Sequence, residues 1–236
     1  MKNKSHTKAD FLYKLTTAKA ALHNITLLPG ETTEIFLQQL ANQLSLDIHE
    51  LKFQYKKQAP FKEGSFVPET YSIPLGIRES TLIKLLLKVS LLNMKQMSKK
   101  IFGTYNEKKW LHYVTIASII QKESANIKEM PIVSSVIYNR LKKRMPLQMD
   151  GTLNYGKYSH IKITPKRIRE DKSTYNTYKH RGLPAYPVCN VSFHAIRAAI
   201  FPAKTSYLYF MRSKNGTHDF EKTFSQHNKN VKNATK

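Results

Sequence analysis

WLHYVTIASIIQKES, residues 110–124, is the stretch around which the rest of this chain is interpreted. Its apolar residues recur at helical spacing and predict an amphipathic helix with Ile116 and Ile120 on the buried face. Glu123 lies within one turn of that face. A carboxyl group there loses hydration, which raises its pKa toward the value that a general acid needs near neutral pH. Glu123 is therefore the leading candidate for a catalytic acid; the alternative is that it ends the helix and leans into water or toward Lys122.

Length and composition indicate a folded protein of one or two domains, and we favour two. The chain has 236 residues, of which 41% are hydrophobic and 11% aromatic, more than a disordered chain carries. Its 39 Lys and Arg against 16 Asp and Glu give a net charge of +23. This charge favours an anionic partner, for which nucleic acid, a phospholipid surface and the carboxylate-bearing cell wall qualify. A generally basic proteome would produce the same charge without a dedicated partner.

This sequence lacks the motifs of several common kinds of enzyme and metal site. Cys189 is the only cysteine, which excludes an internal disulfide and a cysteine-based zinc cluster. There is no GxSxG elbow, phosphate loop, HExxH or glycine-rich dinucleotide turn. His218 and His227 lie close in sequence, but nine histidines are scattered through this basic chain, so we predict neither a metal nor a cofactor. No run of about 18 apolar residues predicts a membrane-spanning helix, and the polar start is not a signal peptide, although an upstream segment could precede it.

The first half of the chain predicts a strand, two helices and a second extended segment, in that order. Residues 1–24 before them are polar, with a short helix expected over 11–22 and no function assigned. An apolar period over 82–97, ended by Gly103, predicts a helix that links the two halves. Four elements are expected between the N-terminal segment and the linking helix. They are a strand over 25–28, a helix that Thr32 or Thr33 caps and that buries Phe36, Leu37, Leu40 and Leu44, a helix that starts near its cap Asp47 and runs through Ile48, Leu51 and Tyr55, and an extended segment over 66–73.

This order of elements resembles a LysM-like module, a small fold that holds glycan chains of amino sugars. The resemblance rests on the turn PGET at 29–32 and on LDIHEL at 46–51. A structural subdomain without a ligand is an equally good interpretation of the same residues.

The second half predicts helices, a loop and a hairpin. Arg140, Lys142, Lys143 and Arg144 lie in the last turn and exit of one of these helices and are interpreted as a solvated basic helix end rather than an anion site. The expected elements are a helix that starts at Pro131 and buries Val133, Val136, Ile137 and Leu141, a brief segment over 147–150, a loop over 159–179, a helix over 193–200 capped by Ser192, a strand over 207–211, a turn at Asn215-Gly216, a return strand over 217–220 and a helix over 223–231.

Blocks spread over residues 110–231 carry a family resemblance. They are ASIIQKES at 117–124, SSVIYNRLKKRMPLQMDGTLNYG at 134–156, YNTY at 175–178, GLP at 182–184, YLYF at 207–210 and the final H-x-F…HN. In this order they resemble the YceG-like family of endolytic murein transglycosylases. In that family the acid is the last glutamate of an A-S-I-(I/V)-E-K-E-(S/T) block, which implies Glu123 here.

The chain also departs from the family pattern. The earlier glutamate of the acid block is Gln121, so Glu123 is the only carboxyl in that block. Gly151 stands where the family usually has a proline after the aspartate, and Ala185, Val191 and Ser192 break the Pro- and Gly-rich turn after GLP. These differences affect the expected loop shapes more than the expected reaction.

The resemblance implies an α+β protein in which a LysM-like subdomain with its linking helix, residues 25–103, precedes a mixed helix and antiparallel-strand catalytic domain, residues 104–236. It implies peptidoglycan glycan strands as substrate, cell-wall synthases as partners and no nucleic acid. It also implies an inner-membrane anchor upstream of a part that faces the periplasm. The groove residues that it nominates beside Glu123 are Ser124, Gln148, Asp150, Tyr155, Asn176, Tyr178, His218 and Asn228.

A single acid suits lytic transglycosylation, whereas glycoside hydrolases usually use two carboxylates. We hypothesise that protonated Glu123 cleaves the bond between N-acetylmuramic acid and N-acetylglucosamine within nascent strands, leaves 1,6-anhydro ends and so terminates elongation. If Asp150 lies beside Glu123 with space for a water, a muramidase reaction competes. Two further alternatives are a murein-binding scaffold with an idle acid and a nucleic-acid module. The charge motivates the latter, together with tyrosines among lysines, namely Tyr13, Tyr55, Tyr155 and Tyr158.

Overall fold

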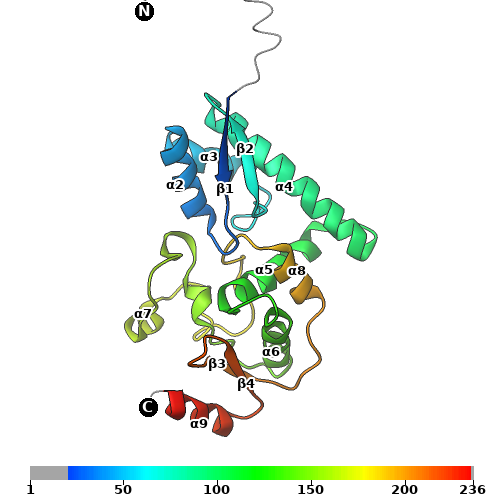
Figure 1. Cartoon of the computed structure of the whole chain (residues 1–236), viewed down its shortest axis with the longest axis vertical. Helices are drawn as coiled ribbons and strands as arrows, with labels where there is room; N and C mark the ends of the chain where they lie inside the picture. The colour runs from blue at the N-terminus through cyan, green and yellow to red at the C-terminus, as the bar shows by residue number, and fades with distance from the viewer. Residues whose placement is uncertain (1–20, 235–236) are drawn as a thin grey trace, which may run out of the picture.

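The computed structural model describes residues 21–234 and confirms the α+β class, with helices and two small antiparallel sheets (Figure 1). The strands β1 and β2 lie with α2, α3 and α4 at one end, and the hairpin β3-β4 lies with α9 at the other. The elements are β1 (Leu22–Thr26), α2 (Thr33–Leu44), α3 (Ile48–Gln58), β2 (Thr70–Pro74), α4 (Glu79–Phe102), α5 (Glu107–Glu123), α6 (Met130–Lys142), the short 3-10 helices η1 (Asp150–Leu153) and η2 (Gly156–Tyr158), α7 (Pro165–Glu170), α8 (Phe193–Ile200), β3 (Tyr209–Arg212), β4 (His218–Glu221) and α9 (Phe224–Ala234).

The N-terminal part has the predicted order of strand, helix, helix, strand. Thr32 caps α2 by accepting a hydrogen bond from Ile35 N, and Asp47 caps α3 by accepting one from His49 N, so both predicted caps are confirmed. β1 and β2 pair antiparallel, with Pro74 at the end of the ladder, where its missing N–H does no harm. The LysM-like assignment stays a prediction.

Both predicted strands of this part differ from the observed ones at their ends. β1 begins at Leu22, which the sequence had placed in a helix, because Ile25 is the only buried residue of β1 and hydrophobicity alone cannot locate the start. The rest of that expected helix, 11–20, lies outside the described residues. β2 is shorter than the extended segment 66–73, since Phe66 N donates to the Asn190 side chain and Val67 N to Ser90 Oγ instead of to a strand.

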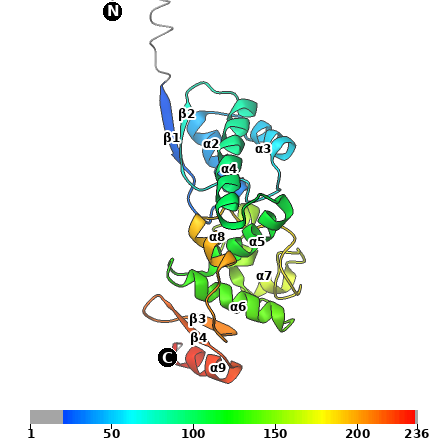
Figure 2. The same ribbon diagram turned by 90° about the vertical axis from the view of Figure 1, so that its right-hand side faces the viewer.

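Helix α4 connects two clusters of buried side chains, as the sequence predicts. Its first half contributes Leu82 and Leu86 to the N-terminal cluster, and further along Met94 belongs to the second cluster. Figure 2 shows α4 running lengthwise from the first sheet toward α5. Gly103 ends the helix at a φ of 74°, a left-handed conformation that glycine adopts without strain.

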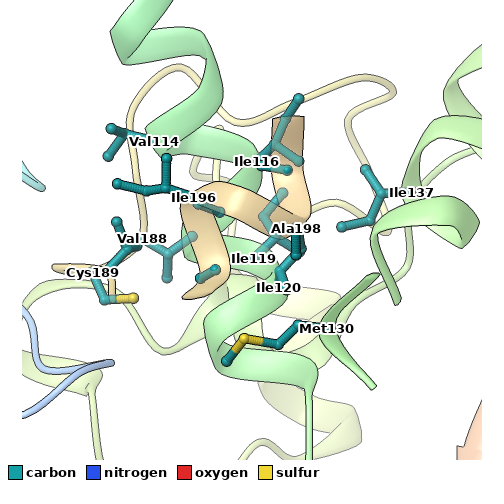
Figure 3. Close-up of a cluster of buried hydrophobic side chains, with 14 of the residues drawn as sticks. Val114, Ile116, Ile119, Ile120, Met130, Ile137, Val188, Cys189, Ile196 and Ala198 are labelled. Atoms are coloured by element: carbon teal, nitrogen blue, oxygen red, sulfur yellow. The ribbon is translucent and has the colours of Figure 1, made fainter. Parts of the chain in front are cut away.

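Helix α5 is the centre of the second cluster (Figure 3). Ile116, Ile119 and Ile120 are fully buried, with α8 packed against one side of the helix and α6 against another. The predicted cap of α8 is confirmed, because Ser192 Oγ accepts from Ala195 N. Burial of this face fixes the direction of α5 and therefore the position of its last residue, Glu123.

The segment 159–179 is not wholly a loop, because it contains the one-turn helix α7. Thr164 Oγ1 accepts from Arg167 N, and Pro165 occupies the first turn, so local capping forms α7 without an apolar stripe that periodicity could detect. The brief segment over 147–150 leads into η1 rather than forming a strand. Farther on, the turn at Asn215-Gly216 does join the antiparallel strands β3 and β4, as predicted.

The two parts of the molecule are joined by backbone hydrogen bonds as well as by α4. Gly30 N donates to Asn190 O at 2.9 Å, and Asn190 N donates to Glu31 O at 2.9 Å. Thr32 Oγ1 donates to Gly156 O at 2.8 Å. None of the helices within residues 21–234 is long and apolar enough to cross a membrane.

Candidate active site

A cavity of about 440 Å³ opens where α5 ends. Five of the predicted site residues line it: Glu123, Gln148, Asp150, Tyr178 and His218. The remaining lining residues, which the sequence did not nominate for the site, are Arg140, Leu147, Met149, Tyr209, Phe210, Met211, Arg212, Phe224 and His227. Aromatic and polar groups thus surround two carboxyl groups, those of Glu123 and Asp150, a composition suited to a sugar polymer.

Glu123 is the last residue of α5 and is half-buried at the cavity wall. Its Oε1 accepts a hydrogen bond from Gly151 N at 2.7 Å. Burial raises the pKa of Glu123 to about 7, with the Gly151 hydrogen bond opposing the shift, the Asp150 charge adding to it and the Arg140 charge reducing it. A substantial fraction of this side chain is therefore protonated near neutral pH, as a general acid requires.

Gly151 packs directly against the candidate acid. A Cβ atom at this position would lie 2.8 Å from Glu123 Oε1 and 2.7 Å from Lys122 Cβ. The close approach needs a residue without a side chain, and the N–H that it brings to Glu123 is one that proline lacks. The departure at Gly151 thus changes the immediate surroundings of the acid.

Asp150 and Tyr178 form a polar pair at the cavity. Tyr178 Oη donates to Asp150 Oδ1 at 2.7 Å, and Asp150 is exposed to solvent. Burial raises the pKa of Tyr178, and the hydrogen bond to Asp150 adds to this shift because ionisation would place two negative charges together. Tyr178 is therefore a hydrogen-bond donor rather than a base in the neutral range.

Arg140 corrects the interpretation of the basic residues at the end of α6. It is only 8% exposed, and its guanidinium donates to the backbone carbonyls of Leu208 at 2.6 Å and Leu147 at 2.8 Å. Arg140 follows Val136 by four residues and so lies on the buried face of α6, a periodicity that could have identified it. It joins the hairpin to the segment that carries Gln148 and Asp150.

Gln148 has a left-handed backbone, with a φ of 50°. Its N–H donates to Thr177 O at 3.1 Å, which holds this conformation. A non-glycine residue in this region costs conformational energy, and such residues concentrate at functional sites. The left-handed backbone of Gln148 turns the chain just before Asp150, and so helps to set the position of Asp150 at the cavity.

Four predicted site residues lie outside the lining of this cavity. Ser124 caps the end of α5, and its Oγ is buried without a hydrogen-bond partner among residues 21–234. Asn176 is fully buried and donates to the carbonyls of Ile168 and Asp171, a structural role. The other two lie elsewhere: Asn228 is exposed on α9, and Tyr155 lines a second cavity of about 320 Å³.

Glu63 is a second buried carboxyl, and it lines that second cavity. Burial raises the pKa of Glu63 to about 7, against hydrogen bonds from Thr33 and Gly64 that lower it. Thr33 N lies 3.0 and 3.1 Å from its two oxygens, Thr33 Oγ1 lies 2.6 Å from Oε1, and Gly64 N lies 3.0 Å from Oε1. These donors tie Glu63 to the first residue of α2, which indicates a structural role, whereas the carboxyl of Glu123 accepts a single hydrogen bond from the described part of the chain.

Glu63→Gln should change how stability depends on pH. The folded-state pKa of about 7 exceeds the ordinary value of 4.5, so the contribution of Glu63 is present below pH 4.5 and is lost as the pH rises through 7. Glutamine does not titrate. Between these limits the difference in unfolding free energy should move in favour of the variant by roughly 3 kcal/mol. Urea unfolding from pH 4 to 8 measures it, and parallel curves for the two proteins would contradict the assignment.

Comparisons with known proteins agree with one another. A family profile described as the YceG-like family matches residues 2–233. An endolytic murein transglycosylase of Bacillus subtilis is 34% identical over 199 residues, 83% of this chain and 54% of that protein. One from Streptococcus pneumoniae is 32% identical over 177 residues, 72% of this chain and 31% of that protein. This chain thus spans about half the length of the first relative and about a third of the second. The crystal structure of a yceG-like protein of Listeria monocytogenes matches with a TM-score of 0.74 and 28% identity, over 94% of this chain and 80% of that one.

Proposed function

Because this chain belongs to the YceG-like family, as its sequence blocks indicate, we propose that it is a peptidoglycan lytic transglycosylase with Glu123 as its catalytic acid. The observation that carries the proposal is a carboxyl with a pKa of about 7 at the wall of an open cavity, held by one backbone N–H. Relatives named endolytic murein transglycosylase support the substrate class. Membership also favours the cell wall among the anionic partners that a charge of +23 allows.

In the first step, protonated Glu123 donates its proton to the glycosidic oxygen between N-acetylmuramic acid and N-acetylglucosamine. The bond from that oxygen to muramyl C1 breaks, and the acetamido group of the substrate supports the positive charge that develops at C1. The Gly151 N–H stabilises the carboxylate that Glu123 becomes.

In the second step, the Glu123 carboxylate takes the proton of the muramyl C6 hydroxyl. O6 then bonds to C1, which closes the 1,6-anhydro ring and returns Glu123 to its protonated form. No water is consumed, because the C6 hydroxyl of the substrate takes the place of water at C1, and a single carboxyl serves both as acid and as base.

Asp150 keeps hydrolysis open as the competing reaction. It is exposed and close enough to raise the pKa of Glu123, so a water activated by Asp150 could attack C1 instead. The hydrogen bond from Tyr178 to Asp150 Oδ1 occupies one of its oxygens and favours closure of the anhydro ring.

Membership of the family also supports a proposal for where the protein acts in the cell. We place the protein at the cell wall, where cleavage within nascent strands would terminate their elongation. An inner-membrane anchor with the catalytic part in the periplasm, and cell-wall synthases as partners, are further proposals that family membership supports. A LysM-like subdomain over 25–103 and a catalytic domain over 104–236 are also proposals that family membership supports.

The products of murein digestion test the proposal. Purified murein is incubated with the protein, and mass spectrometry of the released fragments scores their ends, with murein incubated alone as the control. We expect 1,6-anhydro ends, which are one water lighter than reducing ends. Reducing ends would mean a muramidase, and binding without release would mean a scaffold with an idle acid.

A further inference from the structure

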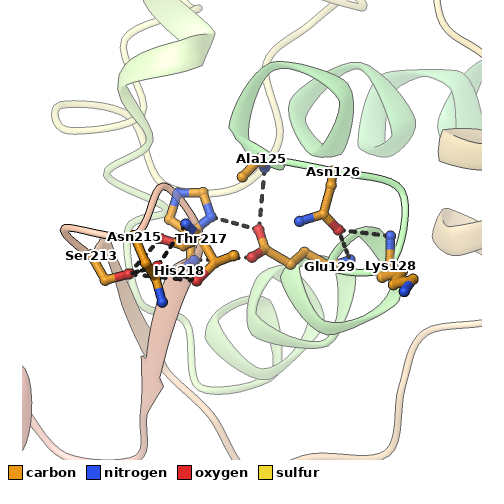
Figure 4. Close-up of polar contacts among 8 residues, drawn as sticks. All are labelled: Ala125, Asn126, Lys128, Glu129, Ser213, Asn215, Thr217 and His218. Carbon is orange, nitrogen blue, oxygen red and sulfur yellow. Dashed lines mark hydrogen bonds and ion pairs between the residues drawn. The ribbon is translucent and has the colours of Figure 1, made fainter.

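Glu129 joins two elements that border the cavity and has no part in the proposed mechanism. Its carboxylate contacts Ala125, two residues after Glu123 at the end of α5, and His218 on the hairpin β3-β4. Glu129 precedes the first residue of α6 and is 7% exposed. Figure 4 shows its carboxylate between the Ala125 backbone and the His218 ring.

The Glu129 carboxylate faces three N–H donors. Its Oε1 accepts from His218 N at 3.0 Å, and its Oε2 accepts from Ala125 N at 3.2 Å and lies 2.8 Å from His218 Nδ1. Burial alone would raise the pKa of Glu129, but the hydrogen bonds from His218 and Ala125 outweigh it and lower the pKa below its ordinary value. Glu129 is therefore a carboxylate, which can only accept.

An acceptor at Nδ1 determines the state of the His218 ring. The proton must sit on Nδ1, so in the neutral ring Nε2 is left as an acceptor. Nε2 has no hydrogen-bond partner among residues 21–234, and the ring lines the cavity in a T-shaped contact with Phe210 at an interplanar angle of 85°. The polar group that His218 offers to a substrate is therefore set by Glu129.

The hairpin turn stabilises the backbone that carries His218. Asn215 Oδ1 accepts from Thr217 N at 3.0 Å and from Thr217 Oγ1 at 2.6 Å, and Ser213 N donates to Thr217 O at 2.8 Å. Thr217 immediately precedes His218, so this network limits movement of the hairpin where the ring is attached (Figure 4).

We propose that Glu129 is a positioning residue for the reaction: it holds His218 with the proton on Nδ1, so that Nε2 accepts a hydrogen bond from a hydroxyl or amide N–H of the glycan. This inference rests on the proposed function. Asparagine or glutamine could not replace Glu129, because the amide N–H₂ would face a donor on whichever side it lay, or would force the ring into the other tautomer.

The first test uses the unaltered protein. Long-range ¹H–¹⁵N correlation spectra at about pH 8, above the ordinary histidine pKa of about 6.5, report which nitrogen of each ring carries the proton. The signals of His218 are assigned from their loss in His218→Gln. We expect the Nδ1–H form, and an Nε2–H ring in the unaltered protein would overturn the proposal even if every Glu129 variant failed to fold.

The second test is a double-mutant cycle with murein cleavage as the readout. Glu129→Gln should lower kcat by roughly 10- to 100-fold, the effect expected when a hydrogen bond to a charged group is lost. In a His218→Gln background the same change should cost little, because both substitutions remove one interaction. Glu129→Asp, which keeps the carboxylate, should restore part of the rate and the Nδ1–H form.

A second His–Glu pair offers a matched control. His160 Nε2 lies 3.0 Å from a Glu31 oxygen, but neither residue lines this cavity. Glu31→Gln should leave kcat unchanged. If the losses of kcat from Glu129→Gln and His218→Gln were additive, and if the His218 tautomer were unchanged in Glu129→Gln, Glu129 would have only a structural role. If the unaltered protein released no product from murein, the proposed function would fail, while the spectra would still decide the state of His218.

Discussion

Glu123→Gln should reduce the rate of murein cleavage roughly a thousandfold, the order expected when a general acid is removed. Glutamine has nearly the same shape, and its amide oxygen can still accept from Gly151 N, which lies 2.7 Å from Oε1 in the native protein. The variant therefore loses the transferable proton but keeps the local packing. Release of anhydro-muramyl ends, followed by mass spectrometry over time, measures the loss.

Measuring the unfolding free energy of Glu123→Gln shows whether the variant is folded, and the pKa of Glu123 determines the sign of the expected change. The folded-state pKa of Glu123 is about 7, above the ordinary 4.5, so its contribution to stability is present below pH 4.5 and is lost as the pH rises through 7. Since glutamine does not titrate, the difference in unfolding free energy should move in favour of Glu123→Gln by on the order of 3 kcal/mol between pH 4 and pH 8. An inactive variant that is also unstable at pH 8 would not establish the role of Glu123.

Glu63→Gln is the matched activity control, because it removes the other carboxyl with a pKa near 7. It should keep the native cleavage rate at temperatures where it stays folded. If Glu63→Gln lost activity and Glu123→Gln retained it, the two buried carboxyls would have been assigned the wrong way round.

Gly151→Ala should lower kcat about 100-fold, the cost that a misplacement of about 1 Å can have at a reacting group. The added Cβ would lie 2.8 Å from Glu123 Oε1 and 2.7 Å from Lys122 Cβ, closer than such atoms approach, so the carboxyl must move. Gly151 does not have a positive φ, so alanine should be tolerated by the backbone. Steady-state kinetics on murein glycans measure the change.

Gly103→Ala serves as the control for Gly151→Ala, because it should affect stability and not catalysis. Its φ of 74° strains any residue with a Cβ, but no atom lies near and the residue is not part of the cavity. This variant should lose stability and keep kcat, whereas Gly151→Ala should lose kcat and also some stability, because its Cβ would clash with Lys122 Cβ as well as with the carboxyl. A native rate for Gly151→Ala would show that the carboxyl position is not critical.

The parts of this fold that local sequence determines were predictable. Capping residues such as Thr32, Asp47 and Ser192 fixed helix starts, and the apolar stripe of α5 fixed the direction of Glu123. Gly103 likewise ended α4 through its backbone alone. In each case the deciding interaction joins residues within about a turn of one another, which a sequence pattern can express.

What escaped prediction depends on contacts between residues far apart in the chain. Glu129 acquires its role from His218, 89 residues later, and nothing near Glu129 indicates it. Glu63 is likewise defined by Thr33, 30 residues earlier. Arg140 is the exception, since its spacing from Val136 placed it on the buried face, but its neighbours Lys142 and Lys143 suggested solvent instead.

Helix α4 has a consequence for how such a protein can be divided. Its Met94 lies in the same buried cluster as Trp110, and Phe61 and Val67 from the first part of the chain lie there too. A breakpoint near residue 103 would therefore strip apolar side chains from the core that supports Glu123. The two parts should therefore fold as one unit rather than as two separable domains.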